Sequence, residues 1–517
     1  MTDNMKPQST LQSELEIALA ETTDEVRKEA TTRRHQRGGR TARENLADLI
    51  DTQTLIEYGQ LAVAAQRSRR QASDIRIDTA ADGVITGIGR VRRDTPTSTA
   101  ETIAVIINDY SVLAGTQGYY HHQKIDRILT IAERNNLPVV MFTEGGGGRP
   151  GDTDADAVVM AGLNSPTFHR WAAMAGRVPR IAVNHGFCFA GNAALFGAAD
   201  IRIATQDSYI GMAGPAMIEG GGLGQYHPTE IGPGSLQSQN GVVDILVANE
   251  SEATDVAKKL LTIISGKHPS TSTSDQNTLQ NALPDNKRVA FDPRKIIHTL
   301  VDDESFIESR PQYGRALVTG FASVAGHSIA LLASDCRHSG GAIDTEAAQK
   351  AIDFCKVAER WRLPVVSLVD TPGFMVGPDS ERQGAVRVMS QLFTEAAAAT
   401  TPWIAVFLRR GYGLGAMALA GGSFAAPGLS LSWPQGEFGG MGLEGAVRLG
   451  FRKELEAVED GPERDALYQR YLDALYAKGR ATEAASYLEI DAVIQPARTR
   501  DMIASYLHQA ADVNPMS

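Results

Sequence analysis

The stretch AERNNLPVVMFTEGGG (132–147) recurs 226 positions later as AERWRLPVVSLVDTPG (358–373). Each copy holds a charged segment, a proline that introduces an apolar run, and a glycine-containing turn. This order is typical of a helix followed by a buried strand in an α/β fold. Recurrence over so long a distance indicates that a whole folding unit is duplicated.

Further segments repeat in the same order along the chain. The matching pairs are LIDTQTLIE (49–57) with LVDDESFIE (300–308), ITGIG (85–89) with VTGFA (318–322), Gln123–Lys124 with Gln349–Lys350, and FAGNAAL (189–195) with YGLGAMAL (412–419). The offset falls from 251 to 224, which longer loops in the first copy explain. We therefore predict one unit written twice.

The segment between the copies, 265–287, is polar and rich in Ser, Thr and Asn, and its composition predicts a linker. We accordingly expect a first domain over 36–287 and a second over 288–517. Residues 1–35 differ in character, because Leu11, Leu15, Ala18 and Leu19 recur at helical spacing among charges. They predict an amphipathic helical extension before the first domain.

Within the first copy, β-branched runs predict strands over 84–91 and 103–109. Apolar positions at helical spacing predict a helix over 123–136, and the run 137–142 predicts a short buried strand. The alternation of strands and a helix favours an α/β class for each copy.

Bulk properties exclude several kinds of protein. The net charge of −11 disfavours nucleic acid as a partner. Three cysteines without a CxxC pair, and an N-terminus without an apolar signal sequence, fit a cytoplasmic protein. The uncharged stretch 411–436 is long enough to span a bilayer, but it is rich in Gly, Ser and Pro. We interpret it as buried backbone or a subunit contact, and expect no membrane segment.

Familiar catalytic motifs are missing from the sequence. The turn TEGGGGRPGD (143–152) lacks the GxxxxGK[ST] pattern of a phosphate loop, and no HExxH or CxxC spacing predicts a metal site. His121, His122 and His185 are weak acid–base candidates, since single histidines are more often packed or solvent-exposed. A basic run, Arg33 to Arg43, is interpreted as a solvated helix face or as recognition of phosphate groups.

Two glycine turns, HGFCFAGNAALFGAAD (185–200) and RRGYGLGAMALAGG (409–422), are copies of each other. Each follows a predicted strand and enters a small-residue segment that can form a helix. Free backbone N–H groups at such a junction can stabilise a developing oxyanion. Tight helix–sheet packing that merely needs glycine is the alternative, and it is less persuasive for two turns in matched positions.

With these turns in place, the sequence resembles the carboxyltransferase (β) subunits of biotin-dependent acyl-CoA carboxylases. The resemblance is carried by 38–51, 82–91, 291–308, 363–374 and the two glycine turns. The runs TEGGGGRPGDTD, CFAGNAAL and GPAMIEGGGLG resemble most the carboxyltransferase region of the single-chain, long-chain acyl-CoA carboxylases. The family fold implied is two tandem crotonase-like (ClpP/crotonase, ββα superhelix) domains, the first binding the CoA ester and the second carboxybiotin.

The resemblance also assigns residues by position. The catalytic N–H groups would be those of Ala190 and Gly191 in the first domain and of Leu414 and Gly415 in the second. Gly413 and Gly415 would contact carboxybiotin. Substrate contacts are expected from Gly147, Gly148, Arg149, Tyr412 and Met417. Propionyl-type enzymes have Asp where Met417 stands, so an apolar residue there permits a different or longer acyl chain.

The implied reaction moves a carboxyl group from carboxybiotin to the α-carbon of an acyl-CoA through two backbone oxyanion holes, without a side-chain base or a metal. No biotin carboxylase or biotin attachment segment is found. Separate biotin carboxylase and biotin carboxyl carrier partners are therefore implied. A homo-oligomer, a hexamer built as a trimer of dimers, is expected, because each substrate is held by a different domain.

Other functions stay open at this point. A biotin-dependent carboxyacyl-CoA decarboxylase subunit would have the same sites and a different partner. A CoA-ester hydratase or isomerase of the same fold would need a glutamate near the thioester, for which Glu219 is the candidate. A non-catalytic scaffold would bind CoA esters without biotin-dependent turnover.

Overall fold

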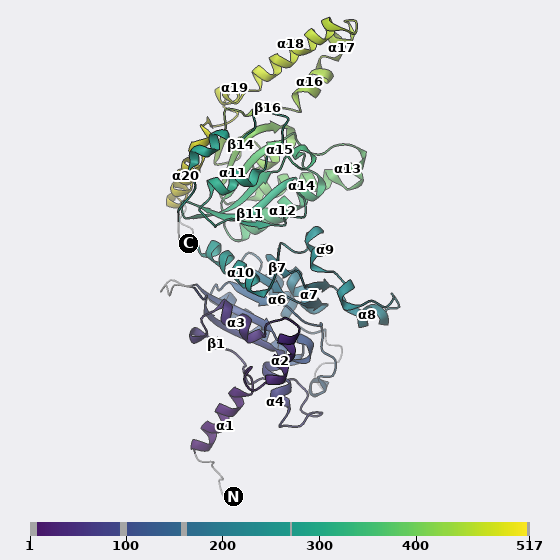
Figure 1. Cartoon of the computed structure of the whole chain (residues 1–517), viewed down its shortest axis with the longest axis vertical. Helices are drawn as coiled ribbons and strands as arrows, with labels where there is room; N and C mark the ends of the chain where they lie inside the picture. Colours follow the sequence, from purple (N-terminus) through teal and green to yellow (C-terminus); the bar gives the residue numbers. More distant parts are fainter. Residues whose placement is uncertain (1–7, 94–100, 157–162, 269–270, 514–517) are drawn as a thin grey trace. The chain divides into compact units, whose positions relative to one another are not determined.

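The computed structural model describes residues 8–93, 101–156, 163–268 and 271–513. The chain divides into two compact units, Met1–Leu261 and Thr262–Ser517, within which the helices and strands are arranged alike (Figure 1). The boundary lies earlier than the predicted one at 287/288. In the segment predicted as a linker, η6 (Gln276–Asn281) packs against η8 (Pro496–Arg498), and Leu279 is buried in the second core. This segment is therefore part of the second unit.

The first unit is built on a sheet with the order β1-β2-β3-β4-β5-β7-β9. Its β1–β3 pairs are antiparallel and the remaining pairs are parallel. The strands are β1 (Ile56–Glu57), β2 (Val84–Arg90), β3 (Thr102–Asn108), β4 (Val139–Phe142), β5 (Arg180–Asn184), β7 (Ile201–Thr205) and β9 (Ile245–Val247). A second layer pairs β6 (Phe187–Phe189) with β8 (Tyr209–Gly211).

The second unit repeats this topology in the order β10-β11-β12-β13-β14-β15-β17. Its strands are β10 (Ile307–Ser309), β11 (Leu317–Val324), β12 (His327–Ser334), β13 (Val365–Thr371), β14 (Trp403–Tyr412), β15 (Leu429–Ser432) and β17 (Ala492–Val493). The long β14 corresponds to β5 and β6 joined, and its end pairs with β16 (Glu437–Gly439) as β6 pairs with β8. The predicted α/β class is confirmed, and the matched topology is what a duplicated unit requires.

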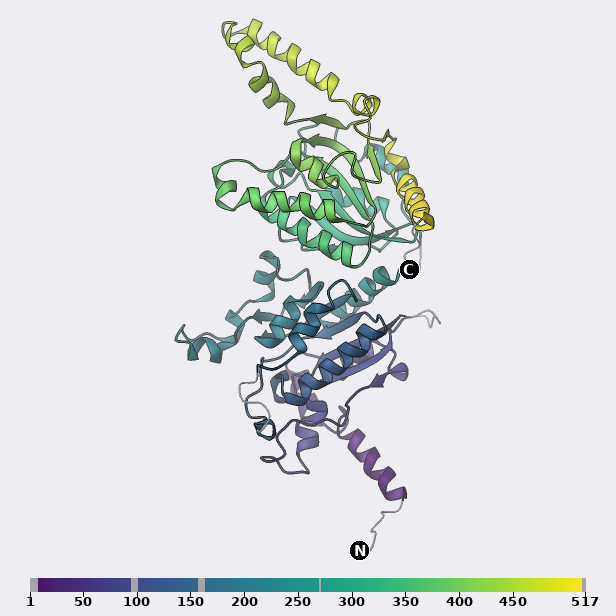
Figure 2. The same ribbon diagram turned by 180° about the vertical axis from the view of Figure 1, so that it is seen from behind.

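A long helix covers each sheet: α5 (Tyr119–Arg134) in the first unit and α12 (Thr345–Arg360) in the second, both seen in Figure 2. Their buried faces follow the periodicity of the sequence, since Ile125, Ile128, Leu129 and Ala132 of α5 are all within the first core. Each helix also buries a lysine at the same repeat position. Lys124 Nζ donates to the Ala81 carbonyl over 2.7 Å.

Helices also lie outside the sheets. At the N-terminus are α1 (Gln8–Ala20) and α2 (Lys28–Gln36), while residues 1–7 of the predicted extension lie outside the described part. Leu11 and Leu15 of α1 are half exposed, so the amphipathic interpretation stays a prediction. In Figures 1 and 2, α16 (Leu443–Gly450) and α18 (Pro462–Lys478) project from the second sheet.

The uncharged stretch 411–436 forms the end of β14, α15 (Gly413–Leu419) and β15. Ala416, Ala418, Leu431 and Trp433 are fully buried there, which fits the interpretation as buried backbone. No helix in the described part of the chain combines the length and apolar character needed to cross a bilayer.

Candidate active site

The turn after β4 and the turn before α7 (Gly191–Gly197) lie side by side in the first unit. Gly145 bridges Cys188, and its N–H donates to the Phe187 carbonyl over 2.7 Å. The side chain of Asn192 links the same turns, because its Oδ1 accepts from the Gly147 N–H over 3.0 Å. The glycine runs that the sequence separates by about forty residues are therefore parts of one site.

Glycine is required at Gly147 and Gly191 because neighbouring atoms leave no room for a Cβ atom. Gly147 has a φ of +89°, and a Cβ on it would lie 2.8 Å from the Cβ of Ala190. A Cβ on Gly191 would lie 2.1 Å from Oε1 of Gln117. The backbone of Gln117 also holds the first turn, since its N–H donates to the Gly147 carbonyl over 2.7 Å and its carbonyl accepts from the Arg149 N–H over 2.9 Å.

The backbone N–H groups at this site are not all free. The Ala190 N–H donates to the Gly211 carbonyl over 3.0 Å, so the N–H that the sequence analysis assigned to oxyanion binding is already used. Among the described contacts, the N–H groups of Gly191 and Gly148 have no acceptor. Gly191 begins α7, where unsatisfied donors are expected. The available pair is thus Gly148 and Gly191.

The second unit has the same arrangement. The Ile343 N–H donates to the Gly373 carbonyl over 3.0 Å, and the Met375 N–H donates to the Ile343 carbonyl over 2.8 Å. The intervening Phe374 N–H has no acceptor among the described contacts. A Cβ on Gly415 would lie 2.8 Å from the Phe374 nitrogen, so these two residues are neighbours. Strand register makes Leu414 the equivalent of Gly191, because Thr371 pairs with Gly411 as Gly145 bridges Cys188. The matching amide pair is therefore Phe374 and Leu414.

Sequence reasoning missed Phe374, because a backbone donor carries no residue-type signature. The repeat held the available signal: Phe374 stands 226 positions after Gly148, the same offset that relates Gly373 to Gly147. Residues of any type can occupy this position as long as their N–H is left unpaired.

The side chains of the second turn lie around this pair. Leu414 is 62% exposed at the start of α15, and Met417 is half buried one turn later. Gly413 has a φ of +59°, and a Cβ there would lie 2.9 Å from the Gly440 carbonyl oxygen. These positions surround the junction of strand and helix without a charged side chain.

Tyr412 is buried and serves the structure of this junction. Its hydroxyl donates to Glu437 Oε1 over 2.7 Å, and its ring packs with Leu443 and Val447 beneath the projecting helices. Burial and the neighbouring Glu437 carboxylate raise the pKa of the Tyr412 hydroxyl far above its usual value. The hydroxyl is therefore a neutral donor already committed to Glu437.

Arg149, predicted to contact substrate, is turned inward. Its side chain is 2% exposed, forms an ion pair with Asp82 and donates to the Thr116 carbonyl over 2.7 Å. Burial raises the pKa of the Asp82 carboxyl, and the Arg149 guanidinium opposes that shift. In this arrangement Arg149 holds the glycine turn from below, and its guanidinium does not face solvent.

The histidine candidates are neutral near physiological pH. Burial lowers the pKa of His185 to about 4, and it holds the pKa of His121 well below the usual range. Burial also lowers the pKa of His122, with the Arg149 charge adding to the shift. Glu219, the candidate for a hydratase, lies exposed on α8 (Pro215–Gly220) and bonds to Gln225.

The basic run divides into two groups. Arg34, Arg40 and Arg43 form ion pairs with Glu144, Asp48 and Glu57 respectively. Arg33 and Arg37 are exposed on and just after α2. The prediction of a solvated face therefore fits only part of the run.

Each of the two similar sheets ends beside a glycine turn with unpaired amides, an arrangement that can stabilise a developing oxyanion. The chain belongs to the carboxyl transferase domain family, whose model matches residues 33–514. The predicted family and the prediction of an enzyme are thereby confirmed.

Named relatives span nearly the whole chain. It is 28% identical to the propionyl-CoA carboxylase beta chain of Saccharopolyspora erythraea, over 93% of this chain and 90% of that one. It is also 28% identical to the methylmalonyl-CoA carboxyltransferase 12S subunit of Propionibacterium freudenreichii subsp. shermanii, over 98% and 96%.

Solved structures of similar proteins belong to acyl-CoA carboxylases and a transcarboxylase. A single-chain, multi-domain long-chain acyl-CoA carboxylase is 47% identical with a TM-score of 0.89, covering 97% of this chain. This chain spans about half of that protein's length, 49%. The transcarboxylase 12S hexamer with methylmalonyl-CoA bound has a TM-score of 0.84 at 26% identity, covering 99% of this chain and 97% of that one.

Proposed function

We propose that the chain is the carboxyltransferase component of a biotin-dependent acyl-CoA carboxylase. It transfers the carboxyl group of carboxybiotin to the α-carbon of an acyl-CoA. The observation that carries the proposal is the pair of equivalent amide couples, Gly148 with Gly191 and Phe374 with Leu414. A reaction with two carbonyl-like partners needs two such sites, and each unit supplies one.

We assign the CoA ester to the first unit and carboxybiotin to the second, with a crotonase-like fold for both. In the first, the Gly148 and Gly191 N–H groups stabilise the enolate oxygen of the thioester. In the second, the Phe374 and Leu414 N–H groups stabilise the ureido oxygen as carboxybiotin gives up its carboxyl group. Each donor contributes about 3 kcal/mol to lowering the barrier.

This division explains why no side-chain acid–base pair is needed. Loss of CO₂ from carboxybiotin leaves a basic ureido group, which takes the α-proton of the thioester. The resulting enolate then attacks CO₂, so the proton and the carboxyl group exchange places. His121 and His185 are weak bases, because burial lowers their pKa values, and Glu219 is exposed, which disfavours the hydratase alternative.

For the acyl group, we propose a chain different from or longer than propionyl. The half-buried Met417 and the exposed Leu414 give the second turn an apolar surface without a carboxylate. The likeness to a long-chain acyl-CoA carboxylase at 47% identity supports the same direction.

For partners, we propose a separate biotin carboxylase and a biotin carboxyl carrier protein, which relatives named as a beta chain or beta subunit of such carboxylases support. The hexamer assembly of the transcarboxylase 12S relative supports assembly of this chain into a hexamer. We propose in addition that the hexamer is a trimer of dimers and that the protein is cytoplasmic.

Transfer of a radiolabelled carboxyl group tests the function. Incubation of the protein with labelled methylmalonyl-CoA or a longer carboxyacyl-CoA should release the label only when free biotin is present as acceptor. Label that stays on every ester in the presence of biotin, while the esters bind, would exclude the proposed transfer with free biotin.

A further inference from the structure

We propose that Arg34 of the N-terminal helix α2 is a positioning residue for the first oxyanion site. It holds Glu144 ionised beneath the glycine turn 145–148 and so fixes the turn that supplies the Gly148 N–H. This proposal rests on the proposed function of that turn, and it concerns a residue outside both sheets.

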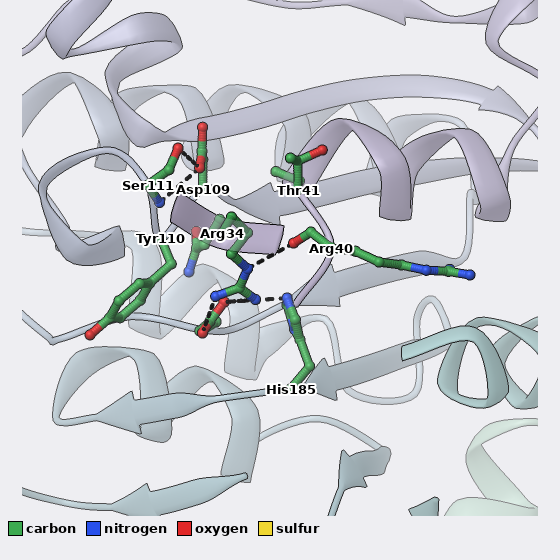
Figure 3. Close-up of a pocket in the computed structure, with 10 residues that line it drawn as sticks. Arg34, Arg40, Thr41, Asp109, Tyr110, Ser111 and His185 are labelled. Atoms are coloured by element: carbon green, nitrogen blue, oxygen red, sulfur yellow. Dashed lines mark hydrogen bonds and ion pairs between the residues drawn. The ribbon is translucent and has the colours of Figure 1, made fainter. Parts of the chain in front are cut away.

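The contacts of Arg34 use its whole guanidinium group (Figure 3). Nη1 donates to Glu144 Oε1 over 2.9 Å and Nη2 lies 2.8 Å from Glu144 Oε2, which makes a bidentate pair. Nε donates to the Arg40 carbonyl over 2.8 Å, and Nη2 also reaches Glu250 Oε1 over 3.3 Å. Such a fork matches a carboxylate in a way that a lysine cannot.

In the second unit, the equivalent buried carboxylate is neutralised by arginines of the sheet itself. Asp370 occupies the position equivalent to Glu144, 226 residues later. Its carboxylate is fully buried and is paired with Arg409 over 2.8 Å and with Arg410 over 2.9 Å, both on β14. These arginines lower the pKa of the Asp370 carboxyl against the opposing effect of burial. A buried carboxylate before the glycine turn is thus common to both units.

The first unit lacks both of these cations. The positions equivalent to Arg409 and Arg410 by strand register are Gly186 and Phe187, because Val139 pairs with Arg180 as Val365 pairs with Trp403. Neither residue carries a charge, and His185, which lies beside Glu144, is neutral near physiological pH. A Cβ on Gly186 would lie 2.1 Å from Glu144 Oε1, so the Glu144 carboxylate lies directly over this glycine. In the first unit, Arg34 of helix α2 supplies the positive charge that pairs with Glu144.

The surroundings of Glu144 make that charge necessary. Burial and the Asp109 carboxylate raise its pKa, and Arg34 opposes both. The ionisable groups around it are Arg34 and Arg40 on or after α2, Asp109 and Tyr110 after β3, His185 after β5, Cys188 on β6, and Glu250 at the start of α10 (Glu250–Ser265). Apart from Arg34 and Arg40 these are acidic or neutral. Arg40 is already paired with Asp48 over 2.6 Å.

Glu144 is directly coupled to the proposed donor. It precedes Gly145, whose N–H and carbonyl both bond to the β6 region, with the carbonyl accepting from the Phe189 N–H over 3.0 Å. A carboxylate without a counter-charge would move toward water and pull this strand end with it. The Gly148 N–H would then leave its place opposite Gly191.

The test compares Arg34→Met with Arg33→Met, a matched control from the exposed face of the same helix. Biotin-dependent decarboxylation of a carboxyacyl-CoA is measured from about pH 6 to about pH 8. We expect Arg34→Met to lose about tenfold in kcat at the upper end, with a smaller loss at the lower end, because burial raises the pKa of Glu144 and a protonated carboxyl needs no counter-charge. Arg33→Met should behave as wild type at every pH.

A second substitution identifies the cause. Glu144→Gln removes the charge that needs Arg34, so Arg34→Met/Glu144→Gln should regain most of the kcat and lose the added pH dependence. Arg34→Lys should fall between wild type and Arg34→Met. A merely structural role for Arg34 predicts lower melting temperatures with an unchanged pH profile and no recovery in the double variant.

Hydrogen exchange of residues 143–149 gives a readout that does not need turnover. Exchange should be faster in Arg34→Met than in Arg33→Met, and the double variant should reverse the difference. Equal exchange in the two single variants overturns the positioning role even if the wild type is active. A wild type without biotin-dependent turnover rejects the proposed function separately, and the exchange comparison still decides the role of Arg34.

Discussion

Gly415 packs against Gly373 so closely that a Cβ on Gly415 would lie 2.6 Å from the Gly373 carbonyl carbon. Both sides of this contact are backbone, so no side chain can turn away to make room. The contact brings the start of α15 onto the turn that carries the Phe374 N–H. The second oxyanion site is therefore set by an approach that only glycine allows.

Gly415→Val should abolish this site. The branched side chain must separate α15 from the 371–374 turn, and loss of one donor alone costs about 3 kcal/mol, or about a hundredfold in turnover. CoA-ester binding, which we assign to the first unit, should persist by calorimetry. Gly440→Ala is the control, because its added Cβ meets no atom within 4 Å. Near-normal turnover in a folded Gly415→Val protein contradicts the assignment.

Gly191→Ala should be milder. Its Cβ meets Gln117 Oε1 at 2.1 Å, but that atom is the far end of a flexible side chain. We expect about a tenfold loss of turnover, with most of it recovered in Gly191→Ala/Gln117→Ala. Gly148→Ala keeps its N–H and meets no atom within 4 Å, so it should retain activity. Failure of the double variant to recover would point to strain elsewhere in the turn.

Met417→Asp should shift the ester preference toward short acyl groups. A carboxylate in this half-buried position disfavours an apolar chain by desolvation. The ratio of kcat/KM for a long carboxyacyl-CoA to that for methylmalonyl-CoA should fall about tenfold or more. An unchanged ratio would separate Met417 from the acyl pocket.

The buried lysine of the second unit predicts a pH-dependent stability. Burial lowers the pKa of Lys350 from 10.5 to about 7, so the folded chain releases a proton that the unfolded chain keeps. Between about pH 7 and 10 the free energy of unfolding should therefore rise with pH, by up to about 1.4 kcal/mol per pH unit from this group.

Lys350→Met should remove that contribution and flatten the slope in urea unfolding. The variant should also be less stable throughout, since Lys350 Nζ donates to the Arg310 and Leu317 carbonyls over 2.8 Å each. Lys356→Met, at a more exposed position of the same helix, is the control. Parallel pH slopes for wild type and Lys350→Met would contradict the shift.

The sequence predicts what depends on local pattern. The duplication, the strands around 84–109, the helix at α5 and the two glycine turns were all readable, because periodicity and glycine placement are properties of neighbouring residues. The sequence does not show which backbone N–H groups remain unpaired. The Ala190 N–H donates to the Gly211 carbonyl, which lies within reach because β6 pairs with β8.

The side-chain partners that escaped prediction are distant in sequence. Arg149 is buried by Asp82, 67 positions before it, and Arg34 pairs with Glu144 across 110 positions. Nothing in a local motif distinguishes a buried arginine from one that contacts a ligand. The boundary between the units, at 261/262, differs from the predicted one for the same reason: Leu279, in a polar segment, packs in the second core.

The most direct measurement is decarboxylation of malonyl-, methylmalonyl- and longer carboxyacyl-CoA by the purified chain, with and without free biotin. This reverse half-reaction requires both amide couples and no partner protein. We predict turnover that depends on biotin and disappears in Gly415→Val. Turnover that proceeds equally without biotin, or ester binding with no turnover under any condition, would contradict a carboxyltransferase that works through its two backbone sites.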